Sequence, residues 1–320
     1  MKRSLKEYIV IGLKGIAMGA ADVVPGVSGG TIAFISGIYE ELLESIDGIS
    51  LNFFKVWKTG GFKKAWLSIN GNFLLALFSG IAVSIVSFAK IIKWLLHNEA
   101  LLLWSFFFGL VLASILYIGK QIQKWNIPVI ITVIIGTVLS YLVTIAEPFA
   151  SPESNWYLLF SGFLAIIAMI LPGISGAFIL LILGAYHTAI NTVTDLFHSV
   201  ISLDFDLFKE AFVKFLMLAI GAIVGIKAFS KVLNWMFKNH KNLTLAMLTG
   251  FMIGSLNKIW PWKEVLSWRT NSKGVEVPFL EKSVSPFTFQ DDNQLLLAIV
   301  FSLIGFGLIF ILERTAKTKA

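Results

Sequence analysis

Long runs of apolar residues, separated by short polar segments, dominate the chain from end to end. A helix needs about 20 apolar residues to cross a hydrocarbon core about 30 Å thick. Six runs meet this requirement or come close to it, and each predicts a full transmembrane helix. They are Phe73–Ile92, Ala100–Gly119, Ile127–Ala146, Phe212–Val232, Leu243–Trp260 and Leu295–Leu312.

Two further apolar regions, Tyr8–Ile46 and Trp156–Val193, are interrupted by proline and glycine. The interruptions read Pro-Gly-Val-Ser-Gly from Pro25 and Pro-Gly-Ile-Ser-Gly from Pro172. Proline removes a backbone donor and disfavours helix in the residue before it, while glycine permits extended or left-handed backbone. Each region is therefore predicted to form two half-length helices. Such a region is a re-entrant hairpin or a broken span whose irregular backbone faces protein or water.

The two halves of the chain resemble each other. With an offset of 147 positions the two Pro-Gly segments align, and a second stretch aligns with an offset of 141. The matching pairs are Pro25 with Pro172, Gly37 with Gly184, Tyr39 with Tyr186, and Ser87–Trp94 with Ala228–Trp235. Matched proline, glycine, lysine and tryptophan predict an internal duplication, with a first repeat over residues 1–146 and a second over residues 147–320.

The distribution of positive charge favours an inverted second repeat. If each hairpin (residues 8–46 and 156–193) enters and leaves on one side, each repeat crosses the membrane three times. Because this number is odd, the second repeat starts on the opposite side and is inverted relative to the first. Lysines of residues 55–64 then lie inside and residues 147–155, without Lys or Arg, lie outside, as the positive-inside rule expects. Fully crossing broken regions would instead make the repeats parallel and place residues 55–64 outside. We prefer the inverted arrangement, with both termini cytoplasmic and an outer loop over residues 261–294.

Composition excludes an ordinary soluble protein. Hydrophobic residues make up 57% of the chain and charged residues 14%, against about 45–50% and about 25% in soluble domains. Mean hydropathy is +0.81. The net charge of +7 is attributed to inner loops rather than to nucleic-acid binding. The absence of cysteine excludes disulfides and thiolate sites, and the basic first residues lack the small-residue cleavage site of a removable signal peptide. The prediction is an all-α polytopic membrane protein, an inverted-repeat transporter with two re-entrant hairpins and about six full transmembrane helices.

The two breaks carry the candidate chemistry. The N-terminus of a half-helix presents unpaired N–H groups and a partial positive charge, and so attracts anions. Paired discontinuous helices at the bilayer midplane are typical of secondary transporters. We therefore predict a phosphate or carboxylate site formed by Gly26, Ser28, Gly29, Gly30, Thr31, Gly173, Ser175 and Gly176, with Pro25 and Pro172 as hinges. The alternative is that these small residues only allow close helix packing.

Three charged positions within apolar surroundings are further candidates. Asp22 precedes the first break, and its counterpart in the second repeat is Met169. A carboxylate inside the membrane is costly, so Asp22 is a candidate site for proton or Na⁺ coupling; alternatively it caps a half-helix or pairs with Lys14. Lys90 and Lys231 match across the repeats and could attract a phosphate headgroup, although lysines near span ends often extend toward the interface instead.

The remaining polar residues do not indicate an enzyme. Glu40, Glu41 and Glu44 follow the first hairpin and are predicted to lie on a solvated face. A membrane lipid phosphatase would need charge-clamping residues or a metal together with a nucleophile or base. The residues that could supply these groups are scattered or outside the spans: His97, His187, His198, His240, Arg3, Arg269 and Arg314. Neither a metal nor a cofactor is predicted.

The residues around the two breaks resemble a known family. Gly19–Thr31, followed by Gly37-Ile-Tyr-Glu-Glu, and Leu171–Gly176, followed by Gly184-Ala-Tyr, are similar to the bacterial domain-of-unknown-function 368 family. Its members are described as polyprenyl-phosphate transporters. The resemblance covers most of the chain and departs only around Lys263–Asn293.

This resemblance implies a substrate and a location. The substrate would be undecaprenyl phosphate, returned from the outer to the inner leaflet of the bacterial cell membrane for reuse in peptidoglycan synthesis. Membrane lipids would be the other partners, with no nucleic acid, and a homo-oligomer stays open. The alternative functions are a transporter or channel for a small anionic solute, and a scaffold protein.

Overall fold

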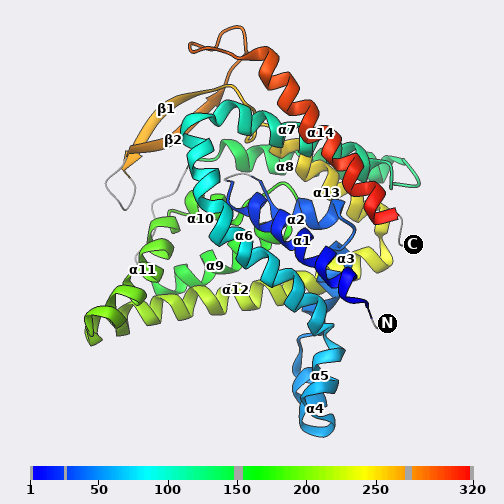
Figure 1. Ribbon diagram of the computed structural model, residues 1–320, viewed down its shortest axis with the longest axis vertical. Helices are drawn as coiled ribbons and strands as arrows, with labels where there is room; N and C mark the ends of the chain where they lie inside the picture. The colour runs from blue at the N-terminus through cyan, green and yellow to red at the C-terminus, as the bar shows by residue number, and fades with distance from the viewer. Residues whose placement is uncertain (1–2, 25–26, 148–153, 271–275, 318–320) are drawn as a thin grey trace.

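The computed structural model describes residues 3–24, 27–147, 154–270 and 276–317 (Figure 1). The first half contains α1 (Leu5–Asp22), α2 (Gly29–Ile35), α3 (Tyr39–Gly48), α4 (Leu51–Gly60), α5 (Phe62–Ser68), α6 (Gly71–Asn98), α7 (Ala100–Gly119) and α8 (Ile127–Ile145). The second half contains α9 (Asn155–Ile170), α10 (Gly176–Ile182), α11 (Tyr186–Ser202), α12 (Phe205–Asn239), α13 (Lys241–Ser255), β1 (Lys263–Thr270), β2 (Glu276–Ser283) and α14 (Leu295–Lys317). The described chain is thus mostly helical, and the antiparallel hairpin β1–β2 is an element that the sequence did not predict.

Several of these helices can cross a membrane. Four are long and apolar enough alone, namely α6 over Gly71–Phe88, α7, α8 and α12, and α10 with α11 forms a fifth candidate bent by 111°. The outer faces of α6, α8 and α12 expose rows of large apolar side chains, such as Val86, Ile134 and Ile223. Surfaces of this kind suit contact with lipid. The described chain is therefore a helical membrane protein.

The predicted span Leu243–Trp260 is wrong at its C-terminal end. Helix α13 ends at Ser255, and tight turns follow in which Lys258 N–H donates to the Ser255 carbonyl at 2.9 Å. Pro261 stands next to this segment and disfavours helix in the residue before it. The five residues after Ser255 therefore form a turn that leads into β1.

Each broken region contains three helices rather than the predicted two. The additional breaks fall at Gly37 and Gly184, which have φ of 72° and 68°. At the first, the Ile38 N–H donates to the Ala33 carbonyl at 3.0 Å; at the second, the Ala185 N–H donates to the Leu180 carbonyl at 2.9 Å. This left-handed glycine cap ends α2 and α10 after seven residues. The prediction of single half-helices after the prolines was wrong because it did not recognise these two caps.

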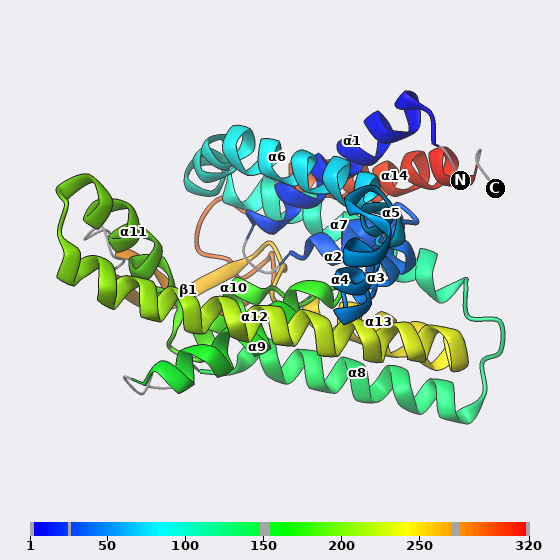
Figure 2. The same ribbon diagram turned by 90° about the horizontal axis from the view of Figure 1, so that it is seen from below.

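The long helices form two layers, which Figure 2 shows from the side. Helices α1, α6, α7 and α14 make one layer, α8, α9, α12 and α13 make the other, and the short helices α2 and α10 lie between them. The first layer holds α1, α6 and α7 of the first half together with α14 of the second half, which packs on α7. The second layer holds α9, α12 and α13 of the second half together with α8 of the first half, which packs on α13. Both described chain ends lie at one end of the molecule, opposite α11 and β1 (Figure 2).

The same close helix contacts occur in both halves. A Cβ added to Gly80 of α6 would meet the main-chain carbonyl of Gly12 in α1, and one added to Gly221 of α12 would meet that of Leu159 in α9. Gly12 and Leu159 are 147 positions apart, and Gly80 and Gly221 are 141 apart. These are the two offsets found in the sequence. Glycine permits such close backbone approach, so α1–α6 and α9–α12 pack through corresponding surfaces.

The contacts between the halves also correspond. Gly109 of α7 lies against the main chain of Ser302 in α14, and Gly250 of α13 lies against that of Val133 in α8. Gly109 and Gly250 are again 141 positions apart. Helix α7 therefore packs on α14 of the other half through Gly109, and α13 packs on α8 of the other half through the equivalent Gly250.

Candidate functional site

The two breaks meet in the interior of the protein. Ser28 Oγ donates to the Leu171 carbonyl at 3.0 Å and lies 3.2 Å from that of Met169. Gly173 N–H donates to Thr31 Oγ1 at 3.1 Å. Ser28 and Thr31 are fully enclosed, with 1% and 0% of their surface exposed. The structure therefore brings the two Pro-Gly segments together, although Pro25 and Gly26 lie outside the described residues.

Asp22 caps the start of α2. Its Oδ1 accepts the Gly29 N–H at 2.7 Å, while the Gly30 N–H bonds to Ser28 Oγ at 3.1 Å. Lys14 donates to the Ser36 carbonyl, at the other end of α2. Of the explanations considered for Asp22, the capping of a half-helix describes its contacts. A carboxylate at this position interacts favourably with the helix dipole and occupies the donors on which an anion would bind.

The second break is capped differently. Ser175 precedes α10 and forms no side-chain cap hydrogen bond. Gly173 has φ of +88°, and an added Cβ would lie 2.9 Å from Ser255 Oγ and 3.0 Å from Met252 Cα in α13. Gly176 faces the Ala165 carbonyl of α9. The glycines of this break therefore allow close packing of α9 and α13, and the Ser175 hydroxyl is the polar group that remains outside the cap.

An apolar cavity reaches the first break from the lipid-facing side. It has a volume of about 170 Å³ and lies between α1, α2, α3, α6, α9 and α12. Asp22 and Gly30 line it, together with Phe78 and Ile226 of the long helices α6 and α12. The Phe78 side chain is half exposed on the outer surface of α6. A hydrocarbon chain could therefore lie in the cavity with one end beside the break.

A smaller cavity lies beside the second break and includes a lysine that the sequence analysis missed. Its volume is about 10 Å³, room for at most one water molecule, and Ser175, Gly173, Thr144 and Lys258 line it. Lys258 lies in the turn after α13, three residues beyond Ser255. Its signal in the sequence is a charged residue within the predicted apolar span Leu243–Trp260.

The predicted headgroup lysines lie elsewhere. Lys90 of α6 and Lys231 of α12 are exposed and line neither of the cavities at the breaks. Lys227, one turn before Lys231, turns inward, where its Nζ donates to the Ile46 carbonyl at 3.1 Å and lies 3.8 Å from Asp47 Oδ1.

The prediction that Glu40, Glu41 and Glu44 lie on a solvated face is incomplete, because each forms an ion pair. The acidic side chains of α3 contact cations from the chain start and from the second half: Glu41 with Arg3 at 2.5 Å, Glu44 with Lys238 at 3.2 Å, Glu40 with Lys241 at 2.8 Å, and Asp47 with Lys227 at 3.8 Å. We call these four ion pairs the α3 clamp. The positions of α11 that correspond to these acids by the offset of 147 are His187, Thr188, Asn191 and Thr194. The α3 clamp is therefore a feature of one end of the molecule.

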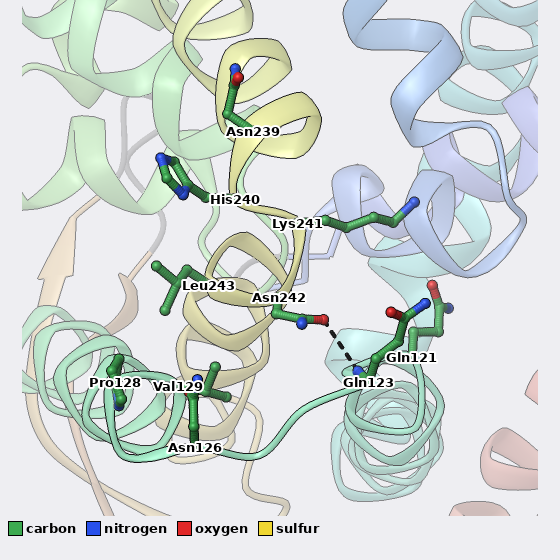
Figure 3. Close-up of a pocket in the computed structure, with 10 residues that line it drawn as sticks. All are labelled: Gln121, Gln123, Asn126, Pro128, Val129, Asn239, His240, Lys241, Asn242 and Leu243. Atoms are coloured by element: carbon green, nitrogen blue, oxygen red, sulfur yellow. Dashed lines mark hydrogen bonds between the residues drawn. The ribbon is translucent and has the colours of Figure 1, made fainter.

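A polar cleft lies near the same end, between the α7–α8 and α12–α13 connections (Figure 3). Its volume is about 420 Å³, and its wall includes His240, Lys241 and Asn126. Asn242 Oδ1 accepts the Gln123 N–H at 3.2 Å across it. None of its lining residues belongs to either break, so this cleft is separate from the candidate site.

Comparisons with known proteins agree with the resemblance found in the sequence. The family described as "VCA0040-like: Undecaprenyl phosphate translocase-like" matches residues 18–277. A Vibrio cholerae serotype O1 protein named Polyprenyl-phosphate transporter is 44% identical over 315 residues, covering 97% of this chain and 98% of that protein. A Staphylococcus aureus protein of the same name is 31% identical over 261 residues, covering 78% and 85%. No solved structure matches the chain.

Proposed function

The chain belongs to the undecaprenyl phosphate translocase-like family, and from this premise we propose that it moves undecaprenyl phosphate from the outer to the inner leaflet of the bacterial cell membrane. The observation that carries the proposal is the apolar cavity, which joins the lipid-facing surface to Asp22 at the start of α2. There the first break is hydrogen-bonded to the second. A polyprenyl chain would stay in contact with lipid while its phosphate reached the protein interior.

The transporter architecture is an inverted repeat. This is supported by the corresponding contacts of α1–α6 with α9–α12 and of α7–α14 with α13–α8. The six spans would be α6, α7, α8, α12, α13 and α14, with the regions α1–α3 and α9–α11 entering from opposite sides. The location of both described ends at one end of the molecule agrees with this orientation. Repeats of this kind rock about a central site to give alternating access.

The phosphate would bind at the two breaks. Its first contact would be with the second break, and the donors of the first break would follow. Ser175 offers a hydroxyl that forms no cap hydrogen bond, whereas the amides of Gly29 and Gly30 are bonded to Asp22 and Ser28. A phosphate can take over the first-break donors only if Asp22 gives them up. Neutralisation of Asp22 by a proton or Na⁺ would allow this exchange, which links the coupling ion to substrate binding. Pro25 and Pro172 would act as hinges.

Loss of the Ser175 hydroxyl should weaken binding of the phosphate. A hydrogen bond to a charged group is worth about 1.5–3 kcal/mol, so Ser175→Ala is expected to raise the Kd for undecaprenyl phosphate about 10- to 100-fold. Ser202→Ala is the matched control, because its hydroxyl bonds to the His198 carbonyl on an exposed face of α11. Binding to purified protein in nanodiscs would be measured for both variants. An unchanged Kd for Ser175→Ala would contradict the placement of the phosphate.

The α3 clamp would hold the inner end closed in this conformation. Breaking two of its ion pairs with Lys227→Gln and Lys238→Gln should expose Ser45, which is 4% exposed on α3. Because the chain has no cysteine, Ser45→Cys provides a single labelling site. We expect maleimide labelling of this site to accelerate several-fold in the double variant. Lys214→Gln, which removes the exposed pair with Glu210, is the control, and equal labelling rates in all three backgrounds would contradict a closing role.

Reconstitution in liposomes tests the function itself. Headgroup-labelled undecaprenyl phosphate should change leaflets in vesicles that contain the protein, while a neutral polyprenol should not. A channel or transporter for small anions would instead pass phosphate or chloride without moving the lipid. Flux of the small anion alone would overturn the proposal, and release of inorganic phosphate from the lipid would indicate a phosphatase.

A further inference from the structure

A cluster of three charged side chains lies at the hairpin β1–β2, next to the small cavity beside the second break. Lys258 Nζ lies 3.3 Å and Lys263 Nζ 3.6 Å from the same oxygen, Oε2 of Glu281. The side chains of Lys258, Lys263 and Glu281 are 20%, 8% and 24% exposed. Two ammonium groups thus share one partly exposed carboxylate, and these three side chains together carry a net positive charge.

Among the described residues, the other contacts of the two lysines carry no negative charge. Lys263 Nζ lies 4.4 Å from the ring of Trp104 in α7, and Lys258 Nζ lies 4.6 Å from the ring of Phe178 in α10. Lys263 also donates to the Lys258 main-chain carbonyl. Burial lowers the pKa of Lys263 to about 8, against the opposing attraction of Glu281. Aromatic faces and a carbonyl stabilise an ammonium group only in part, so the cluster could accept more negative charge.

We propose that Lys258 and Lys263 form a capture site for a phosphate monoester at the outer entrance of the transporter, and that Glu281 occupies this site until the phosphate arrives. The inference rests on the proposed function and adds the residues that select the headgroup. A phosphate monoester carries about 1.5 to 2 negative charges at neutral pH and three acceptor oxygens. It can therefore pair with both ammonium groups, whereas the single carboxylate of Glu281 neutralises one.

The position of the cluster links it to the breaks. Lys258 also lines the small cavity beside Ser175 and Gly173. A phosphate held by Lys258 would therefore lie next to the hydroxyl that we propose as the first internal contact. This order takes the headgroup from the hairpin to the second break, at the end of the molecule opposite the α3 clamp.

Release of Glu281 requires β2 to move, although the end of this strand is held by the Val284 N–H on the Trp262 carbonyl and by the Ser283 hydroxyl on the Asn257 carbonyl. An isolated two-stranded hairpin is only marginally stable, and the pairing of β1 with β2 is irregular on both sides of Ser267. Glu281 is in β2, so a small displacement of this strand would withdraw its carboxylate. Lys258 lies in the turn after α13, and Lys263 packs on Trp104, so the two cations would stay in place for the incoming phosphate.

Binding measurements on the purified full chain in nanodiscs test the site. The probes are a polyprenyl monophosphate, the corresponding polyprenol and inorganic phosphate. Lys258→Gln and Lys263→Gln should each weaken binding of the polyprenyl monophosphate about tenfold or more, since each removes one charge-assisted contact. Glu281→Gln should strengthen binding about threefold or more, because a competing carboxylate is lost. Lys282→Gln, on the exposed side of the same strand, should change nothing.

Phosphate capture predicts weaker binding in the lysine variants and stronger binding in Glu281→Gln, and this difference separates it from a purely structural role of the cluster. If the ion pairs only hold the hairpin in place, Glu281→Gln will weaken binding or leave it unchanged, and either result overturns the inference. Should Lys263→Gln fail to fold, Lys258→Gln and Glu281→Gln carry the same test. Lysine-dependent binding of inorganic phosphate would support a site complete without lipid. If the lysine variants weaken binding of the polyprenyl monophosphate while inorganic phosphate does not bind, the site is one that requires the lipid tail as well as the phosphate.

The result also distinguishes this inference from the proposed function. Weaker binding in Ser175→Ala with unchanged binding in both lysine variants would overturn the capture site and leave the transport proposal standing. Failure of the unmodified protein to bind the polyprenyl monophosphate would overturn both.

Discussion

Replacement of Asp22 by Asn is expected to abolish gradient-driven transport while the protein stays folded. The Asn side chain keeps an oxygen that can accept the Gly29 N–H, now bonded to Asp22 Oδ1 at 2.7 Å, so the cap of α2 is retained. It loses the charge that a proton or Na⁺ would neutralise. Transport of labelled undecaprenyl phosphate into proteoliposomes would be measured with and without proton and Na⁺ gradients. We expect at least a tenfold fall in the gradient-dependent rate.

Two companion variants sharpen this experiment. Asp22→Ala removes both the charge and the cap, and it should lower the free energy of unfolding by about 1 kcal/mol, the usual cost of losing a cap. Asp206→Asn makes the same chemical change at an exposed position of α12 and should transport normally. If Asp22→Asn retains its full response to a gradient, Asp22 is a structural cap alone and the coupling site must be sought elsewhere.

Replacement of Gly173 by Ala is expected to destabilise the fold severely. The φ of +88° disfavours any residue with a Cβ, and the added methyl group would lie 2.9–3.0 Å from atoms of Ser255 and Met252. Left-handed backbone costs about 1–2 kcal/mol for such a residue, and overpacking about 1–3 kcal/mol. The free energy of unfolding should therefore fall by about 2–5 kcal/mol.

Gly307→Ala is the matched control for this prediction. Gly307 lies in α14, where an added Cβ would meet nothing within 4 Å. Alanine is a better helix former than glycine, so this variant should be as stable as the parent or slightly more. Reversible unfolding in bicelles would compare the two. Equal stability of Gly173→Ala and the parent would show that the break relaxes, and would favour a ligand-approach role for Gly173 over the packing role.

The sequence predicted the parts of the site that depend on local backbone chemistry. Proline cannot continue a helix, so the breaks at Pro25 and Pro172 could be located without a structure. The caps at Gly37 and Gly184 were missed although both glycines were matched between the repeats. A glycine inside an apolar run is compatible with an uninterrupted helix, and only the left-handed backbone and the returning hydrogen bonds identify a cap.

Charges far apart in the sequence were harder to interpret. Nothing in the order of residues pairs Asp47 with Lys227 or Glu281 with Lys258, because each pair forms only when separate helices or strands pack together. The same holds for Asp22, for which three roles were open until its contact with Gly29 was seen. An ionisable group within an apolar segment indicates a function or a partner, but not which one.

The sequence by itself determined that the protein is helical, that it lies in a membrane, that it contains two Pro-Gly breaks and that it resembles polyprenyl-phosphate transporters. These properties follow from apolar run length, local backbone restrictions and motif similarity, which do not require distant contacts. Only the tertiary structure decided that the two breaks contact each other, that an apolar cavity reaches Asp22, and that Lys258 and Lys263 both pair with Glu281. Those features depend on packing between helices that are far apart in the chain, and short-range sequence patterns do not specify such packing.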